Sequence, residues 1–133
     1  MLRTSPDTLL EGEILKAGKF LKSMYNEYYA FMQGDGNFVI YLSSSFQAKN
    51  AMWATGTYGP NSGNKLPFYV TLQTDGNLLV FDKRKTALWS TDTWGRGPSP
   101  HYLVMESDGN LVLYDGNGTS TWTSGSSNYH ICH

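Results

Sequence analysis

A nine-residue pattern of hydrophobic and polar positions occurs three times along this chain. The copies read QGDGNFVIY from Gln33, QTDGNLLVF from Gln73 and ESDGNLVLY from Glu106. Each contains an Asp-Gly step, which favours a tight turn because glycine adopts a positive φ without steric cost. Each copy therefore predicts a β-hairpin that turns at Asp-Gly and continues into a second strand.

Hydrophobic residues alternate along that second strand, and successive side chains of a strand point to opposite faces. One face is apolar and is predicted to belong to the core, whereas the other carries a mixed set that begins with an asparagine. The predicted core residues are Phe38, Ile40, Leu78, Val80, Leu111 and Leu113.

A tryptophan follows each copy, with a serine or threonine two residues after it; the three are Trp53, Trp89 and Trp122. The asparagine of the pattern and the tryptophan are 12 residues apart in the second and third copies and 16 apart in the first. Four extra residues are therefore expected in the first unit, within SSSFQAKN at 43–50. Because the tryptophan has a fixed place in each unit, it is predicted to pack in the core and not to form a ligand platform.

The three units indicate an all-β domain. Before the first copy, LLEGEILKAGKFLKS predicts two short strands broken at Gly12 and Gly18, which would open the first unit. Three similar units are expected to close around a pseudo-threefold axis, because closure removes exposed sheet edges. Both a three-sheet β-prism and a β-trefoil satisfy this requirement.

Composition and charge narrow the class further. With 133 residues the chain is predicted to be a single domain over 1–133, with a C-terminal tail from about residue 126. A formal net charge of -1 provides no attraction to nucleic acid, and the one cysteine, Cys132, can form no intrachain disulfide. The charged N-terminus and the absence of a long apolar stretch predict a soluble protein, without membrane insertion. It would be cytoplasmic, or secreted without a recognisable signal peptide.

The outward face of the first hairpin has the groups that a sugar requires. Gln33, Asp35, Asn37 and Tyr41 supply two amides, a carboxylate and a phenol around the small apolar Val39. Sugar hydroxyls donate and accept hydrogen bonds, while ring C–H groups favour an apolar contact. A turn alone explains Asp-Gly-Asn, but it requires neither the glutamine nor the tyrosine on the same face.

The pattern Gln-x-Asp-x-Asn-x-Val-x-Tyr, repeated three times with a following tryptophan, resembles the bulb-type (monocot) mannose-binding lectins over about residues 10–126. The resemblance implies a type II β-prism of three four-stranded antiparallel sheets. It also implies α-mannose as the ligand, held without metal or other cofactor, and a homodimer formed by exchange of C-terminal strands. In the first copy it implies that Asp35 and Asn37 bond the sugar O2, Gln33 bonds O3, Tyr41 bonds O4 and Val39 touches the ring carbons.

The other two copies depart from the family pattern, so the first site is predicted to bind best. The second has leucine for valine and phenylalanine for tyrosine, and the third has glutamate for glutamine. The second candidate site comprises Gln73, Asp75, Asn77, Leu79 and Phe81, and the third comprises Glu106, Asp108, Asn110, Val112 and Tyr114.

No catalytic arrangement is recognised in the sequence, because His101 has no evident nucleophile partner. His130, Cys132 and His133 carry metal-ligating groups, but three potential ligands at a chain end are weak evidence for a metal site. The chain is therefore predicted to be a lectin and not an enzyme. A β-prism protein-interaction module that has lost sugar binding is the alternative.

Overall fold

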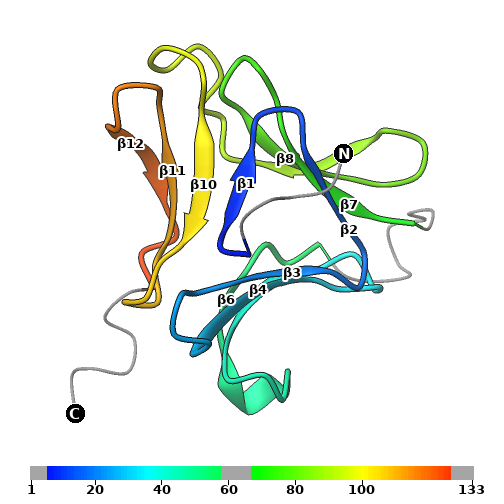
Figure 1. Cartoon of the computed structure of the whole chain (residues 1–133). Helices are drawn as coiled ribbons and strands as arrows, with labels where there is room; N and C mark the ends of the chain where they lie inside the picture. The colour runs from blue at the N-terminus through cyan, green and yellow to red at the C-terminus, as the bar shows by residue number, and fades with distance from the viewer. Residues whose placement is uncertain (1–5, 58–66, 127–133) are drawn as a thin grey trace.

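The computed structural model describes residues 6–57 and 67–126, and these residues form three four-stranded antiparallel sheets. The sheets surround a common interior as the three sides of a prism (Figure 1), which confirms the predicted all-β β-prism and excludes the trefoil. The tail from 127 onward, with His130, Cys132 and His133, lies outside the described residues. In strand order, the first sheet is β3 (Phe20–Lys22), β4 (Tyr28–Met32), β5 (Phe38–Leu42) and β6 (Ala51–Ala54); the second is β2 (Ile14–Lys16), β7 (Tyr69–Leu72), β8 (Leu78–Phe81) and β9 (Ala87–Ser90); the third is β1 (Thr8–Leu10), β10 (Tyr102–Met105), β11 (Leu111–Tyr114) and β12 (Ser120–Thr123).

The N-terminal segment corrects the sequence-based expectation of two strands within the first unit. It forms three strands, and β1, β2 and β3 each join a different sheet as an edge strand. Gly12 and Gly18, with φ of 82° and 90°, lie at the corners where the chain passes between sheets. The middle residues Leu9, Leu15 and Leu21 are at most 1% exposed. The six-residue spacing of these leucines was the overlooked signal, because each three-residue strand turns one side chain inward.

The interior of the prism contains the predicted core. All six residues predicted from the alternating pattern are 0% exposed, and they form one cluster with the three N-terminal leucines. The outward face of the hairpins is also closely packed, since Val39, Tyr41 and Leu79 are 3%, 6% and 8% exposed. The candidate sites therefore lie on a closely packed surface.

The repeated tryptophans pack against the core, as predicted, although they are only partly buried, and they also contact one another. Trp53, Trp89 and Trp122 lie on β6, β9 and β12, the last strand of each sheet. Their ring centroids are 5.5–5.7 Å apart with interplanar angles of 66–76°, and they pack against the core cluster. Edge-to-face contacts of this kind stabilise the junction of the three sheets. Trp94, outside the repeat, is 68% exposed.

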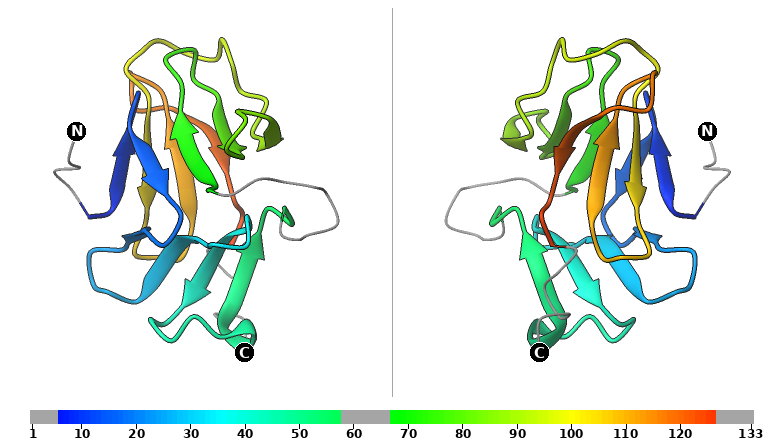
Figure 2. Two further views of the ribbon diagram at one scale, coloured as in Figure 1. Left: turned by 90° about the vertical axis from the view of Figure 1, so that its right-hand side faces the viewer. Right: turned by 90° about the vertical axis from the view of Figure 1, so that its left-hand side faces the viewer.

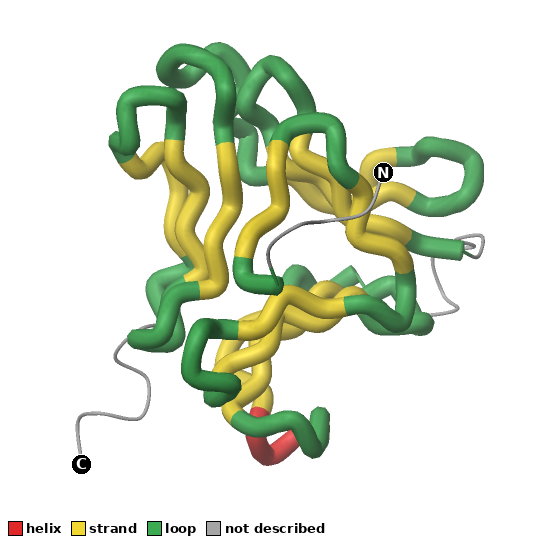
Figure 3. The backbone as a smooth tube through the Cα atoms, in the orientation of Figure 1, coloured by secondary structure: helices red, strands yellow, loops and turns green. Residues whose placement is uncertain are grey.

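The four extra residues of the first unit lie between β5 and β6, as predicted. Tyr41 pairs with Ala51 across this connection, whereas Phe81 pairs with Ala87 in the second unit. The longer connection contains a 3-10 turn at Ala48–Asn50 and projects at the outer end of the first sheet (Figures 2 and 3). Across the described ranges, no helix has the length and apolar character needed to cross a membrane.

Candidate functional site

The structure places one candidate site on the outward face of each sheet. In the first, the backbone N–H of Gln33 donates to the backbone carbonyl of Asn37 at 3.0 Å, and the backbone N–H of Gly36 donates to the backbone carbonyl of Gln33 at 3.2 Å. Equivalent bonds close the other two turns. The last residue of each pattern faces a tyrosine on the neighbouring strand; the pairs are Tyr29 with Tyr41, Tyr69 with Phe81 and Tyr102 with Tyr114.

The aspartate of each pattern stabilises its own turn with one carboxylate oxygen. Oδ1 of Asp35 accepts the Asn37 N–H at 3.0 Å, and Asp75 and Asp108 accept the corresponding N–H groups at 2.9 Å. The three carboxylates are exposed. In the first site Oδ2 of Asp35 also accepts from Nε2 of Gln33, at 3.2 Å. An ionised carboxylate has about four acceptor positions, so a position remains for a ligand hydroxyl.

The asparagine of each pattern uses its carbonyl oxygen to hold the segment after the tryptophan. Oδ1 of Asn37 accepts hydrogen bonds from Thr55 Oγ1 at 3.2 Å, from the Gly56 N–H at 2.8 Å and from the Thr57 N–H at 3.3 Å. Asn77 and Asn110 make matching bonds in their units. Within the described part of the chain, the amide nitrogen is therefore the group that each asparagine has left for a ligand.

A second hydroxyl, four residues after each tryptophan, fixes the turn from the other side. Sequence analysis missed this residue, although its signal is present as Trp-x-Ser/Thr-x-Ser/Thr in every unit. The hydroxyl donates to the carbonyl of the turn glycine: Thr57 to Gly36 at 2.6 Å, Thr93 to Gly76 at 2.8 Å and Ser126 to Gly109 at 2.7 Å.

The first site has a continuous hydrogen-bonded chain of polar groups. The Tyr41 hydroxyl donates to Oε1 of Gln33, and Nε2 of Gln33 donates to Oδ1 of Asp35 at 3.0 Å. Burial raises the pKa of Tyr41, and the charge of Asp35 adds to the effect. The phenol is therefore a neutral group whose oxygen can still accept a hydrogen bond from a ligand.

In the other two sites, the hydrogen-bonded chain of side chains is interrupted, at a different point in each. In the second, Phe81 supplies no hydroxyl for Gln73. In the third, Tyr114 donates to Oε2 of Glu106; this bond raises the pKa of Tyr114 to about 12, with burial adding to it. Glu106 has no amide N–H to donate to Asp108, so the amide-to-carboxylate link of the first site is absent there.

Each turn glycine packs against a ring of the next unit, which lies at the start of β4 or just before β7 or β10. The glycines have φ of 91–97°, and an added Cβ would be crowded by that ring. The units thus support one another's sites in cyclic order. The Cβ of Gly36 would lie 3.1 Å from the Phe68 ring, that of Gly76 2.7 Å from Nε2 of His101, and that of Gly109 3.0 Å from the Tyr28 ring.

His101, beneath the second site, is 2% exposed and hydrogen-bonded through both ring nitrogens. Nδ1 lies 2.8 Å from Oε1 of Glu11, and Nε2 lies 2.8 Å from the Arg96 carbonyl. A carboxylate and a carbonyl are both acceptors, so both nitrogens can donate at once only in the imidazolium form, which this arrangement favours. Burial by itself lowers the pKa of His101, but the bonds to Arg96 and Glu11 and the Glu11 charge outweigh it, so the pKa is raised.

Phe46, from the insertion between β5 and β6, gives the first site an aromatic wall. Its ring stacks on Phe31 at 4.4 Å and lies 5.4 Å from Tyr41, and Phe20 and Tyr29 complete the cluster. Tyr41 is consequently buried, whereas its counterparts in the other sites are partly exposed. The spacing of the repeats located the insertion but did not reveal this contact.

Comparison with known proteins identifies similar chains, although no protein-family model matches. A mannose-specific lectin from Dendrobium findlayanum is 37% identical over 84 residues, which cover 63% of this chain and 44% of that protein. The chain therefore spans less than half the length of this relative. A monomeric monocot mannose-binding lectin from Gastrodia elata superposes with a TM-score of 0.76 at 32% identity, covering 90% of this chain and 97% of the other. The snowdrop (Galanthus nivalis) mannose-specific agglutinin, in complex with methyl α-D-mannoside, superposes with a TM-score of 0.69 at 31% identity, covering 90% and 96%.

Proposed function

Because this chain belongs to the bulb-type mannose-binding lectin family, we propose that it is a lectin that binds terminal α-mannose on glycans without a metal ion. The observation that carries the proposal is the hydrogen-bonded chain of Tyr41, Gln33, Asp35 and Asn37 on the first sheet. Each of these side chains is held by hydrogen bonds to its neighbours and keeps a further donor or acceptor position for a ligand. Such pre-organisation limits the entropy lost on binding.

In the first site, each group has a proposed role. The second oxygen of Asp35 and the amide nitrogen of Asn37 bind the sugar O2, and Gln33 binds O3. The Tyr41 oxygen accepts from O4, while Val39 contacts the ring carbons. The geometry supports these assignments. The turn occupies Oδ1 of Asp35, the following segment occupies Oδ1 of Asn37, and Oδ2 of Asp35 has only the bond from Gln33 at 3.2 Å, so it keeps an acceptor position, as the Asn37 amide nitrogen keeps its donors.

The second and third sites are proposed to bind the same sugar more weakly. The second lacks the phenol at Phe81, and the third has carboxylates at both Glu106 and Asp108. The remaining proposed contacts of the second site are Gln73, Asp75, Asn77 and Leu79. Those of the third site are Asn110, Val112 and Tyr114.

The proposed activity is reversible binding with no catalytic step, by a single soluble domain, either cytoplasmic or secreted. No metal or other cofactor takes part, because side chains supply all the contacts to the sugar. Within the described ranges no three His, Cys, Asp or Glu side chains are grouped to hold a metal ion. Affinity at one site is expected to be weak, since sugar hydroxyls exchange good hydrogen bonds with water for those with the protein.

A homodimer that increases avidity is part of the proposal. β12 pairs with β11 of the same chain, so all four strands of the third sheet come from one chain. Dimerisation by exchange of C-terminal strands would require β12 to leave this position. Light scattering at several concentrations measures the oligomeric state, and a monomer throughout the range would refute this part.

The test of the proposed function is binding to immobilised mannose with and without chelator, together with titration of methyl α-mannoside. Asn37→Asp is the most informative variant, because it keeps an oxygen for Thr55, Gly56 and Thr57 but removes the amide donor. It should lose about tenfold or more in first-site affinity, the scale of one lost bond to a buried polar group, while remaining folded. Retention that disappears in chelator would refute the metal-free mechanism. Absence of any binding would favour the interaction module.

A further inference from the structure

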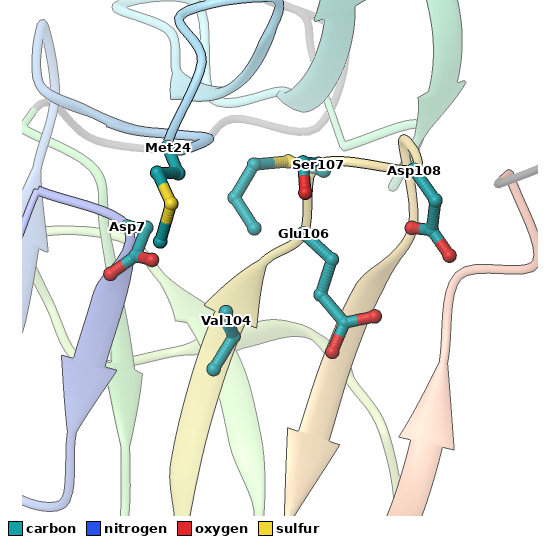
Figure 4. Close-up of a pocket in the computed structure, with 7 residues that line it drawn as sticks. Asp7, Met24, Val104, Glu106, Ser107 and Asp108 are labelled. Carbon is teal, nitrogen blue, oxygen red and sulfur yellow. The ribbon is translucent and has the colours of Figure 1, made fainter.

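A cavity of about 370 Å³ adjoins the third site and is shared with it through Glu106 and Asp108. We call it the Met24 pocket. Figure 4 shows Asp7 at the start of β1, Met24 from the turn between β3 and β4, and Val104 on β10 arranged around the opening beside Glu106. Its volume lies at the small end of the range of about 300–1,000 Å³ that is typical of small-molecule sites. The third site therefore continues into a hollow that part of a larger ligand can enter.

The walls of this pocket are fixed on one side and adaptable on the other. The Met105 N–H donates to the Asp7 carbonyl at 2.8 Å, and Oδ1 of Asp7 accepts from Thr8 at 2.8 Å, so Asp7 has a fixed place. Met24 is 70% exposed. A methionine adapts its shape to an apolar surface because it is unbranched and polarisable.

The lining has a definite chemical preference. The carboxylates of Glu106 and Asp108 can accept hydrogen bonds, Ser107 can donate or accept, and Met24 offers an apolar surface. A neutral sugar residue matches this set, since it presents several hydroxyl donors and a face of C–H groups. A negatively charged residue is disfavoured by the carboxylates of Glu106 and Asp108, which border both the pocket and the third site.

We propose that the Met24 pocket is a subsite for the second sugar residue of a neutral oligosaccharide whose terminal residue occupies the third site. This inference rests on the proposed function, because the third site must first bind a terminal sugar. The subsite gives the third site a preference for oligosaccharides over monosaccharides. Contacts in the subsite compensate for the loss of the glutamine that Glu106 replaces. Glu106 then lines both the third site and the subsite.

The test uses the full chain and follows each site separately by amide chemical shifts during titration. The probes are methyl α-mannoside, a panel of mannobioses of different linkage, and a disaccharide of mannose with a uronic acid. At least one mannobiose should bind the third site about three- to tenfold more tightly than methyl α-mannoside and shift the amides of Met24 and Ser107. The acidic disaccharide should show no such gain.

Met24→Ala should remove most of the mannobiose gain and leave the affinity for methyl α-mannoside unchanged. Tyr25→Ala is the matched control, because Tyr25 is 74% exposed in the same turn and does not line the pocket. Both residues are largely exposed, so neither change should affect folding.

Three results would overturn the subsite: equal third-site affinity for methyl α-mannoside and every mannobiose, equal gain with the acidic disaccharide, or a third site silent to every probe. In each case, binding at the first site would leave the proposed function intact. If no probe shifts any amide of the three sites, the proposed function itself is wrong, and the subsite is refuted with it.

Discussion

The substitution Phe81→Tyr should give the second site the phenol hydroxyl that it lacks and that Tyr41 supplies in the first site. Phe81 faces Tyr69 across the strand pair as Tyr41 faces Tyr29, so the new hydroxyl would occupy the position of the Tyr41 hydroxyl. In the first site that hydroxyl donates to Gln33. In the variant, Gln73 is the corresponding acceptor, and the oxygen remains able to accept from the sugar.

The expected gain is that of one hydrogen bond between ligand and protein. A typical net value is about 0.5–1.5 kcal/mol, which corresponds to about two- to tenfold in affinity at the second site. The cost in packing is small, because Phe81 is only partly buried and its ring stays 5.5 Å from that of Tyr69. Leu79, where the first site has Val39, limits the gain if its extra methylene holds the sugar away. The double change with Leu79→Val should therefore exceed the sum of the single changes.

The measurement is titration with methyl α-mannoside, followed at the amides of Gly76 and Asn77, for the parent, both single variants and the double variant. Tyr41→Phe provides the reciprocal control and should lose at the first site about what Phe81→Tyr gains at the second. If the double variant binds no better than the parent while Tyr41→Phe weakens the first site, the second hairpin is not a disabled sugar site. The equivalence inferred from the three repeats would then fail at that position.

Three further predictions concern the support of the sites. Since the folded pKa of His101 is raised and that of Glu11 is lowered, their pairing should stabilise the protein in full between about pH 4.5 and 6.5 and lose that contribution as pH rises through the raised value. Denaturant unfolding at several pH values should show this loss, and His101→Phe, which copies Phe68, should abolish the dependence. Phe46→Ala should lower the free energy of unfolding by about 1–3 kcal/mol and weaken the first site more than the second, as measured by unfolding and site-resolved titration. Gly76→Ala should cost about 1–3 kcal/mol, because its φ is positive and the new Cβ would meet His101; unchanged thermal stability would contradict this packing.

The sequence alone determined the repeated parts of this protein. Asp-Gly fixes each hairpin turn, strict alternation decides which side chains face the core, and the spacing to each tryptophan locates the insertion. These features depend on residues close together in the chain, where turn chemistry and strand periodicity act directly. The fifteen candidate residues could be named for the same reason, because each site lies within one hairpin.

Only the tertiary structure decided how the units support one another. The three N-terminal strands each join a different sheet, because a lone three-residue strand is stable only as an edge of an existing sheet. Glu11 and His101 are 90 residues apart and meet because closure of the prism brings the corner between β1 and β2 against the third unit. Met24 borders the third site for the same reason. No local pattern encodes such contacts, since they arise from packing between units and not from the conformation of any one of them.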